Sequence, residues 1–441
     1  MLRPLIFRTL ITNSGLAALS LLNSVLLSRW LGPEGRGEVA AAMLWPTLLV
    51  YLSSLGLIAS ILYFSALPES NTQQIFSNGI AFASIQSIVA IIIGLISLRW
   101  LLHSQSESVV SAGKLYLFVI PLSLVIQYGT SILQGQMRIS IFNYLRAIVP
   151  IGYLIGTIAL MLSGQLTLLN IIILHLSLNG FVLVATLIYL ARLGVSLRLR
   201  VNGLLAKQMM KYGLKVHIGI LSGIANLSLD QVLMAALLPP AYLGLYVVAV
   251  SSAGVSQVFS QAVQMVLTPS ITKKENQSER VAVLQGVFRR YWLLSLVVTT
   301  MIGLLLPVAI PFVFGNNFRG AIWPAEVLLL GALFIGAKEV LAGGAQALGN
   351  PWLGSKAQLG ALIITIALLY FLLPRLGIMG AAIATAAAYL AQLVIVVSGL
   401  RHSHNISLTG LFYISSKDIS SALNLFELIK GQRAPLVSDQ S

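Results

Sequence analysis

The 441-residue sequence contains no cysteine and few charged residues. The first absence excludes disulfides, thiol catalysis and cysteine-ligated metals. Only 9% of the residues are charged, whereas a soluble domain needs roughly a quarter of its residues charged to cover its surface. The chain also lacks a G-x-x-x-x-G-K-S/T phosphate-binding motif and any metal-ligand spacing. Water is therefore not the solvent over most of this surface, and the sequence indicates neither an ATP-driven pump nor an enzyme.

The chain has a series of long apolar runs instead. Hydrophobic residues make up 57% of the sequence, and the mean hydropathy is +0.92. Each run is close to the ~20 residues that cross ~30 Å of hydrocarbon as a helix. Because the runs are apolar on both faces, they predict helices and not barrel strands. The sequence predicts an all-α polytopic membrane protein with about twelve transmembrane helices, near residues 9–31, 40–62, 77–98, 115–133, 144–163, 168–190, 213–238, 243–268, 291–314, 324–348, 357–373 and 378–400.

Basic residues are distributed unevenly between the two sides of these spans. If the N-terminus is cytoplasmic, the inner loops hold clusters such as Arg198, Arg200, Lys207 and Lys211. The outer turns hold only scattered cations such as Arg36. This bias follows the positive-inside rule and predicts that both termini lie in the cytoplasm. The net charge of +15 is spread over membrane-flanking loops, so membrane lipids are the expected partners and nucleic acid is not.

The sequence contains a weak internal repeat. Residues 23–42 align without gaps on residues 230–249, so that Pro33 and Gly37 meet Pro240 and Gly244. This alignment predicts two six-helix lobes related by a parallel pseudo-twofold axis along the membrane normal, with a substrate site between them. The expected organisation is an N-terminal six-helix lobe at 1–190, a basic cytoplasmic linker loop at 191–212, a C-terminal six-helix lobe at 213–400 and a partly amphipathic cytoplasmic tail at 401–441.

The tail differs in composition from the rest of the chain. A short amphipathic helix over 411–430 would gather its apolar side from Leu411, Phe412, Ile419, Leu423, Phe426 and Ile429. Such a helix is typical of a segment that lies on the membrane surface. Docking on a partner protein is the alternative.

Polar side chains inside the spans are the candidates for a transport pathway, because polar groups in a bilayer are costly and usually face a cavity or another helix. Asp230 has Asn226 one turn before it, and Gln257, Gln261 and Gln264 form one helical stripe. The candidates taken from the spans are Asn23, Arg29, Gln127, Asn226, Asp230, Gln257, Gln261, Gln264, Lys338, Glu339 and Gln346. No Asp or Glu lies in the middle of the first six spans.

Each candidate also has a purely structural interpretation. Glutamine and asparagine stripes often bond neighbouring helices. Lys338 could simply pair with Asp230 or Glu339, which would neutralise charge in a low dielectric. His175 could titrate, although a lone histidine is more often a hydrogen-bonded structural group. The sequence leaves these alternatives open.

Four short segments resemble the turns of a known family of transporters. Residues 29–38, RWLGPEGRGE, are similar to the R-x-L-G-P-E-G-x-G turn of bacterial polysaccharide-unit flippases, the Wzx-type O-antigen flippases. These belong to the multidrug/oligosaccharidyl-lipid/polysaccharide exporter superfamily. The segments PAYLGLY at 240–246, LGNP at 348–351 and LGIMGAA at 376–382 resemble further turns of the family, in the same order.

This resemblance implies a flippase that moves undecaprenyl-pyrophosphate-linked oligosaccharide across the inner membrane by alternating access, for surface polysaccharide biosynthesis. It implies no cofactor, but a proton or sodium gradient or the membrane potential as the driving force. Related flippases carry an acidic residue nine positions after the motif arginine, where this chain has Glu38. A polysaccharide polymerase and other assembly proteins are the implied protein partners.

Arg29, Asp230 and Lys338 are the charges expected in the cavity. Their small number favours a neutral or weakly charged glycan. One alternative is a cation-coupled small-molecule exporter, which the lack of acidic residues in the first six spans disfavours. Another is a membrane scaffold of polysaccharide assembly that transports nothing.

Overall fold

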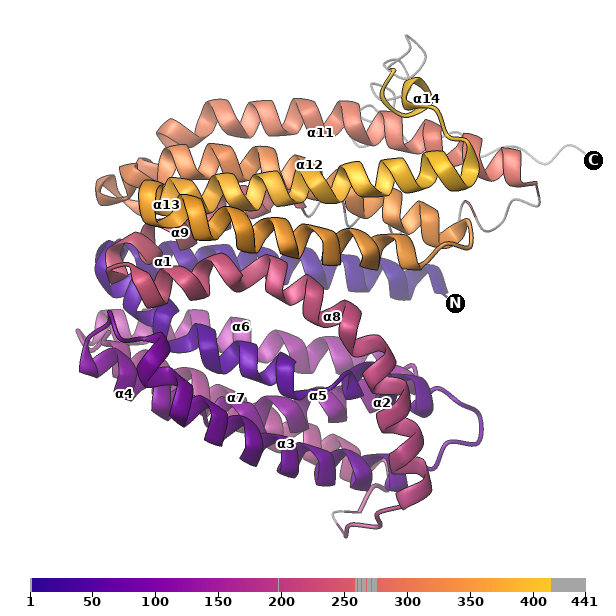
Figure 1. Ribbon diagram of the computed structural model, residues 1–441. Helices are drawn as coiled ribbons and strands as arrows, with labels where there is room; N and C mark the ends of the chain where they lie inside the picture. The colour runs from indigo at the N-terminus through magenta and orange to yellow at the C-terminus, as the bar shows by residue number, and fades with distance from the viewer. Residues whose placement is uncertain are drawn as a thin grey trace, which may run out of the picture. The chain divides into compact units, whose positions relative to one another are not determined.

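The computed structural model describes residues 2–196, 198–257 and 276–413, together with positions 260, 263, 267 and 271 (Figure 1). Over these residues the regular elements are all helical. Eight segments are long and apolar enough to cross a membrane, among them Thr72–Leu101 and Leu168–Arg192. The prediction of an all-α, multi-pass membrane protein is therefore confirmed.

The first half of the chain forms seven helices within the described residues. Their bounds are α1 Leu2–Ser53, α2 Leu57–Ser65, α3 Thr72–Leu101, α4 Glu107–Tyr116, α5 Val119–Gly135, α6 Ile139–Leu162 and α7 Leu168–Arg192. α1 comprises two helical arms that meet at a kink at Gly32, whose φ of 68° is not helical. Pro33 then occupies the first position of the returning helix, where its missing N–H costs nothing.

The second half contains the other helices of the part of the chain that the structure describes. Their bounds are α8 Gly203–Leu237, α9 Pro240–Ala253, η1 Gly254–Ser256, α11 Gln277–Phe314, η2 Asn316–Ala321, α12 Ile322–Ala347, α13 Trp352–His404 and α14 Leu408–Phe412. Gly377, at φ 55°, reverses α13 as Gly32 reverses α1. The last two predicted spans are therefore the two arms of α13.

The basic linker is shorter than the sequence analysis expected. Residues 191–212 were expected to form a loop, but α8 already begins at Gly203. The side chain of Asn202 caps this helix by accepting a hydrogen bond from the backbone N–H of Leu205 at 3.1 Å. The side chain of Asn78 on α3 binds the backbone of Asn202 in turn. Its Nδ2 donates to the carbonyl oxygen of Asn202, and its Oδ1 accepts from the backbone N–H of Asn202. A cap that is fixed by a neighbouring helix allows α8 to start almost three turns before the expected span.

The chain divides into two compact units. Unit 1 comprises Met1–Ser252, Leu306–Leu328 and Leu362–Thr385, and unit 2 comprises Ala253–Leu305, Leu329–Ala361 and Ala386–Ser441. The second half of the chain contributes to both units. The lobe boundary that the sequence places at 191–212 stays a prediction.

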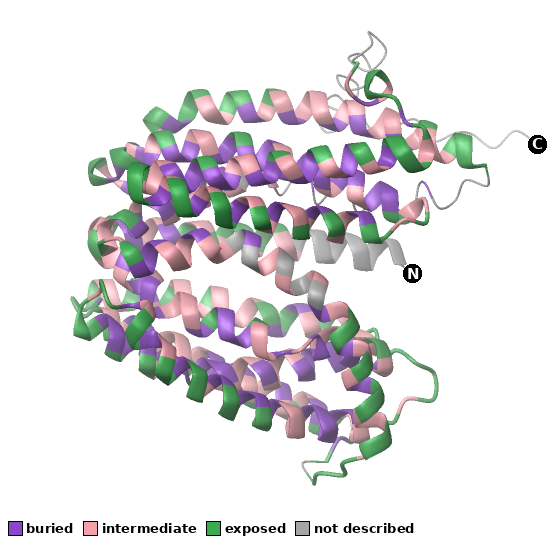
Figure 2. Cartoon of the chain, in the orientation of Figure 1, coloured by how far each residue is buried: buried purple, intermediate pink, exposed green. Residues whose placement is uncertain are grey.

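Lipid is the natural solvent for the outside of these helices. Figure 2 shows exposed positions along α3, where Ile88, Ile92 and Ile96 are exposed although each side chain is apolar. Leu304 and Phe312 have exposed fractions of 76% and 75% on α11. Apolar side chains at this density on the surface indicate contact with acyl chains and not with water.

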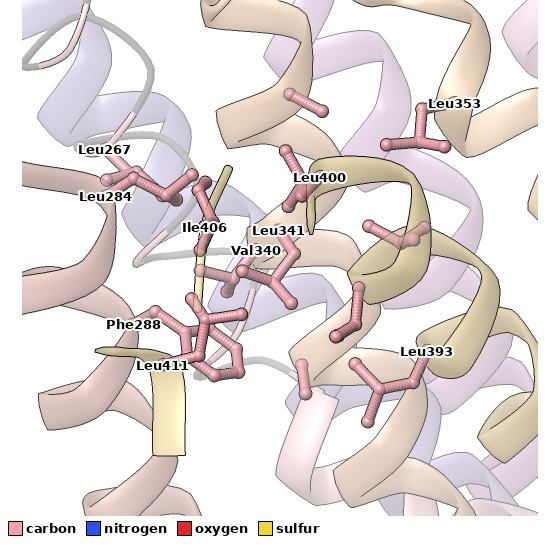
Figure 3. Packing of buried hydrophobic residues seen from close by; sticks show 14 of the residues in the cluster. Leu267, Leu284, Phe288, Val340, Leu341, Leu353, Leu393, Leu400, Ile406 and Leu411 are labelled. Atoms are coloured by element: carbon pink, nitrogen blue, oxygen red, sulfur yellow. The ribbon is translucent and has the colours of Figure 1, made fainter. Parts of the chain in front are cut away.

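Unit 2 has its own apolar core, which includes the start of the tail. Figure 3 shows Phe288, Val340, Leu400 and Leu411 meeting in one cluster. Phe412 packs edge-to-face on Phe288, with ring centroids 5.5 Å apart. The described part of the tail therefore packs on its own chain, and the expectation that Leu411 and Phe412 face the membrane surface was wrong. Residues 414–430 of the expected amphipathic helix lie outside the described residues.

Candidate functional site

Unit 1 contains a cavity of about 480 Å³. Its walls come from both arms of α1 and from α6, α7, α8 and α9. The polar side chains among its described lining residues are Ser20, Asn23, Ser24, Arg36, Thr47, Tyr153, His175, Gln231 and Ser251. A polar cavity bounded by membrane-spanning helices is the kind of place where costly intramembrane polar groups become useful.

One wall of the cavity is polar but neutral. Asn23 donates from Nδ2 to the carbonyl oxygen of Pro150 at 3.3 Å. Its Oδ1 is buried and has no hydrogen-bond partner among the described residues. The hydroxyls of Ser24 and Ser251 lie 3.3 Å apart and join α1 to α9. This wall offers donors and acceptors without a formal charge, which suits sugar hydroxyls.

Arg36 brings a positive charge to the cavity, and the sequence analysis missed it. It was counted as an outer-turn cation, but the returning arm of α1 starts at Pro33 and places Arg36 one turn inside the helix, in the cavity wall. Its Nε atom is buried without a partner in the described part of the chain. Such an orphaned donor is rare in native proteins and calls for an explanation. The Gly-Pro reversal at 32–33 was the sequence signal that could have located it.

His175 forms the next part of the wall. Its Nδ1 lies 3.0 Å from the hydroxyl of Tyr116 and 3.1 Å from Nδ2 of Asn179. The ring of Tyr153 meets the imidazole edge-to-face, with centroids 5.4 Å apart. These contacts join α4, α6 and α7 around one imidazole. His175 is therefore held in a defined orientation at the cavity, and its contacts are those of the hydrogen-bonded structural group considered from the sequence.

Asp230 lies on α8, and its side chain is buried with an exposed fraction of 4%. Oδ2 accepts hydrogen bonds from the hydroxyl of Tyr246 and, at 2.9 Å, from the hydroxyl of Thr385. Oδ1 accepts from the backbone N–H of Gln231 at 2.7 Å. One carboxylate thus connects α8 with α9 and α13, and its neighbour Gln231 lines the cavity.

Asn226 lies one turn before Asp230 and faces the same helix of the second half. Its Oδ1 accepts a hydrogen bond from the hydroxyl of Thr365 at 3.2 Å. Both residues are buried, so this face of α8 is joined to α13 by polar contacts at two levels. The structure therefore brings Asn226 and Asp230 together, as their spacing predicted.

The other expected charges have local partners. Lys338 is buried in unit 2, where its Nζ lies 2.7 Å from Oε1 of the adjacent Glu339. This contact favours the pairing alternative that was considered from the sequence. Arg29 is exposed and donates to the carbonyl oxygens of Phe312 and Val313. A cation at the carbonyl end of α11 stabilises that helix end, so Arg29 has a structural contact.

The remaining candidates are dispersed. Glu38 and Gln127 belong to unit 1 but are not among the described residues that line the cavity. Gln257 is half-buried, and its carbonyl oxygen accepts from the hydroxyl of Ser260 at 2.8 Å. Gln346 is exposed on α12. Gln261 and Gln264 lie outside the described residues.

The turns aligned by the internal repeat touch each other. A Cβ atom on Gly37 would overlap the carbonyl oxygen of Pro240, and a Cβ on Gly244 would overlap that of Pro33. The contact is reciprocal, as expected for positions related by a twofold axis. Only glycine permits this close approach of two backbones. The matched Pro-x-x-x-Gly pairs therefore form a single backbone contact between the two repeats.

Comparison with known proteins gives a consistent family and fold. Residues 26–322 match the family described as "Polysaccharide biosynthesis protein". The probable low-salt glycan biosynthesis flippase Agl15 of Haloferax volcanii is 25% identical over 287 residues. That match covers 64% of this chain and 58% of the relative, so the chain spans less than two thirds of the relative's length.

Two solved structures have the same fold. The lipid II flippase MurJ in an inward closed conformation is 14% identical with a TM-score of 0.74, over 96% of this chain and 93% of that chain. A multidrug resistance MATE family transporter in an inward-facing conformation is 13% identical with a TM-score of 0.72, over 88% of this chain and 96% of that chain. The transporter fold expected from the resemblance of the turns is therefore confirmed.

Proposed function

This chain belongs to the family of polysaccharide biosynthesis proteins, and we propose that it is a flippase that moves a lipid-linked oligosaccharide across the inner membrane. The cavity of about 480 Å³ in unit 1 carries the proposal. A glycan headgroup cannot cross hydrocarbon unaided, because each unsatisfied polar group costs several kcal/mol there. A wall of hydroxyl and amide groups replaces the water that the headgroup loses.

Alternating access requires a contact on one side of the cavity that can open. The reciprocal contact of Gly37 with Pro240, and of Gly244 with Pro33, joins the two repeats at turns that the charge bias predicts to lie outside. Because the contact is between backbone atoms, it cannot open by a change of side-chain rotamer. The two turns have to move apart for it to open. In the proposed cycle this contact stays closed while the headgroup enters from the cytoplasm and opens for its release outside. Both termini are then cytoplasmic, as the charge bias predicts.

We propose that Asp230 couples this cycle to a proton or sodium gradient. Its carboxylate is buried and bound by neutral donors from Tyr246 and Thr385. Its hydrogen-bond partners among the described residues include no cation, and a buried carboxylate in such surroundings favours uptake of a proton or cation. Uptake would change the hydrogen bonds that connect α8 with α9 and α13, and Gln231 would transmit the change to the cavity.

The test uses purified protein in vesicles that contain an undecaprenyl-pyrophosphate oligosaccharide with a fluorescent label on the glycan. A membrane-impermeant glycosidase added outside cleaves only the glycan of the outer leaflet. The expected result is cleavage of nearly all the label when the protein is present, and of the outer-leaflet share alone in protein-free vesicles. Equal cleavage in both samples would contradict the proposal.

The same vesicles distinguish the alternatives. A small-molecule exporter would expel a lipophilic cationic dye along an imposed proton or sodium gradient and leave the labelled glycan in place. A scaffold would move neither. A flippase coupled through Asp230 would move the glycan faster when a gradient is imposed, and the polymerase and other assembly proteins would then act on the glycan delivered outside.

A further inference from the structure

We propose that Arg36, His175 and Tyr153 form a phosphate-binding subsite at one side of the cavity in unit 1. This subsite would hold the phosphate that links the carrier lipid to the glycan, while the neutral wall around Asn23 and Ser24 faces the sugars. The inference rests on the proposed function in its choice of ligand. The chemistry of the subsite itself rests on the donors that the cavity presents.

Arg36 supplies the charge. Its guanidinium lines the cavity, and the buried Nε has no protein acceptor among the described residues. The described lining residues include no acidic side chain that could neutralise it. A guanidinium in this situation needs an anion, and its planar donors match phosphate oxygens in pairs.

His175 supplies a neutral donor of defined direction. The Nδ2 group of Asn179 can only donate, and it lies 3.1 Å from Nδ1 of the imidazole. The hydroxyl of Tyr116 lies 3.0 Å from the same nitrogen. Because Nδ1 accepts, the proton of the neutral ring is on Nε2. His175 lines the cavity, and in the proposed subsite its Nε2–H donates to the phosphate.

Tyr153 connects these two residues. Its ring packs edge-to-face on His175, with an interplanar angle of 84°. Its side chain is also close enough to Arg36 for an electrostatic interaction between the two groups. Tyr153 lines the same cavity, and in the proposed subsite its hydroxyl is the third donor. Three donors therefore come from three helices, α1, α6 and α7.

This arrangement suits a tetrahedral oxyanion better than a planar one. Phosphate presents oxygen acceptors in several directions, whereas a carboxylate presents two oxygens in one plane. Donors that approach from three helices can each reach a different phosphate oxygen. The single cation compensates part of the charge of one phosphoryl group, so binding remains reversible, as transport requires.

The experiment measures binding of two probes to the full chain in nanodiscs of neutral lipid: undecaprenyl phosphate and inorganic pyrophosphate. Arg36→Gln is expected to weaken binding of undecaprenyl phosphate roughly tenfold to a hundredfold, because a charge-assisted contact is lost. Competition by inorganic pyrophosphate would show that phosphate alone is recognised. Binding of the lipid probe without such competition would show that the carrier chain is needed as well.

The variants of His175 test its role as a donor. His175→Gln keeps an N–H donor near the position of Nε2 and is expected to retain most of the affinity. His175→Phe keeps the ring and removes the donor, and it is expected to weaken binding several-fold. Equal affinity of the two variants would contradict the assignment of His175.

Arg99→Gln is the matched control, because it removes the same charge from an exposed position on α3. Thermal melting of each variant in detergent excludes unfolding as the cause of lost binding, and Arg36→Lys supplies a second variant that keeps the charge. If Arg36→Gln binds as tightly as Arg99→Gln, the subsite is overturned even where the vesicle assay shows flipping. If phosphate binding depends on Arg36 while no glycan crosses the vesicle membrane, the subsite stands and the proposed function fails.

Discussion

Asp230 and Lys338 are both buried charged residues of the second half, but their surroundings differ. Asp230 accepts hydrogen bonds from Tyr246, Thr385 and the backbone of Gln231, and these partners come from three helices. Lys338 pairs with Glu339, its own neighbour along α12. The contacts of Asp230 depend on how three helices pack together, whereas the contact of Lys338 with Glu339 lies within one helix. A change of charge at Asp230 can therefore move helices, and a change at Lys338 acts mainly on its own helix.

The largest expected effect is on transport by Asp230→Asn. The amide keeps the size of the side chain but cannot take up a proton or a cation, so we expect the flipping rate to fall by about tenfold or more, the effect of a single transition-state interaction of ~1.4 kcal/mol. Protein level and membrane insertion should persist. The vesicle assay measures this at equal protein density.

Glu339→Gln is the matched control for Asp230→Asn, because it makes the same carboxylate-to-amide change in unit 2. We expect it to retain most of the flipping rate. If Glu339→Gln impairs transport as strongly as Asp230→Asn, the contrast between a carboxylate that joins several helices and one that pairs within its own helix is wrong.

Tyr246→Phe should have the next largest effect, this time on stability. It removes one hydrogen bond to a buried carboxylate and leaves the ring in place, so we expect a loss of about 2 kcal/mol. Thermal unfolding in detergent, monitored by tryptophan fluorescence, measures it. Tyr242→Phe, at a position on α9 where the side chain is exposed, is the control and should leave the unfolding midpoint unchanged. An unchanged midpoint for Tyr246→Phe would show that this hydrogen bond does not stabilise the junction of α8 and α9.

Glu339→Gln should lower stability by less than Tyr246→Phe. It removes the charge partner of a buried ammonium, but the Glu339 side chain has an exposed fraction of 41% and water replaces part of the interaction. We expect a loss of about 1 kcal/mol. Repeating the change in a Lys338→Met background tests the pairing directly, because the second loss should then disappear. Equal losses in both backgrounds would mean that the two residues are independent.

The smallest expected effect is that of Arg29→Ala. Arg29 is exposed and donates to the carbonyl oxygens at the end of α11. A cation at a helix C-terminus contributes about 0.5 kcal/mol at an exposed position. We expect a small decrease of the unfolding midpoint and an unchanged flipping rate in vesicles. A large loss of transport would indicate that Arg29 acts as a charge in the transport cavity, as the sequence analysis expected.

Sequence reasoning located the helices more reliably than the cavity. The apolar runs and the Gly-Pro turn at 32–33 predicted where α1 crosses and returns, because desolvation and backbone geometry act locally. The same reasoning misplaced the cations. Arg29 and Arg36 are seven positions apart in the sequence, yet Arg29 contacts α11 and Arg36 lines the cavity. Which positions of a helical hairpin face the cavity depends on helices distant in the sequence.

The repeat shows the same division. The alignment of Pro33 and Gly37 with Pro240 and Gly244 was visible in the sequence. That the two aligned pairs touch each other is a tertiary result, because each glycine is required by the backbone of the other repeat. In a sequence this rich in apolar residues, an alignment by itself does not distinguish identities that arise by chance from positions that touch in the fold.

The amino-acid sequence by itself determined that this protein resides in a bilayer, which segments form its apolar helices, and which turns reverse the chain. Those properties follow from the hydropathy of short segments and from the conformations of glycine and proline. Tertiary structure alone decided that Arg36 and His175 share a cavity and that Asp230 connects three helices. Such assemblies depend on which faces of distant helices meet, and an all-round apolar helix carries no local signal of its facing neighbour.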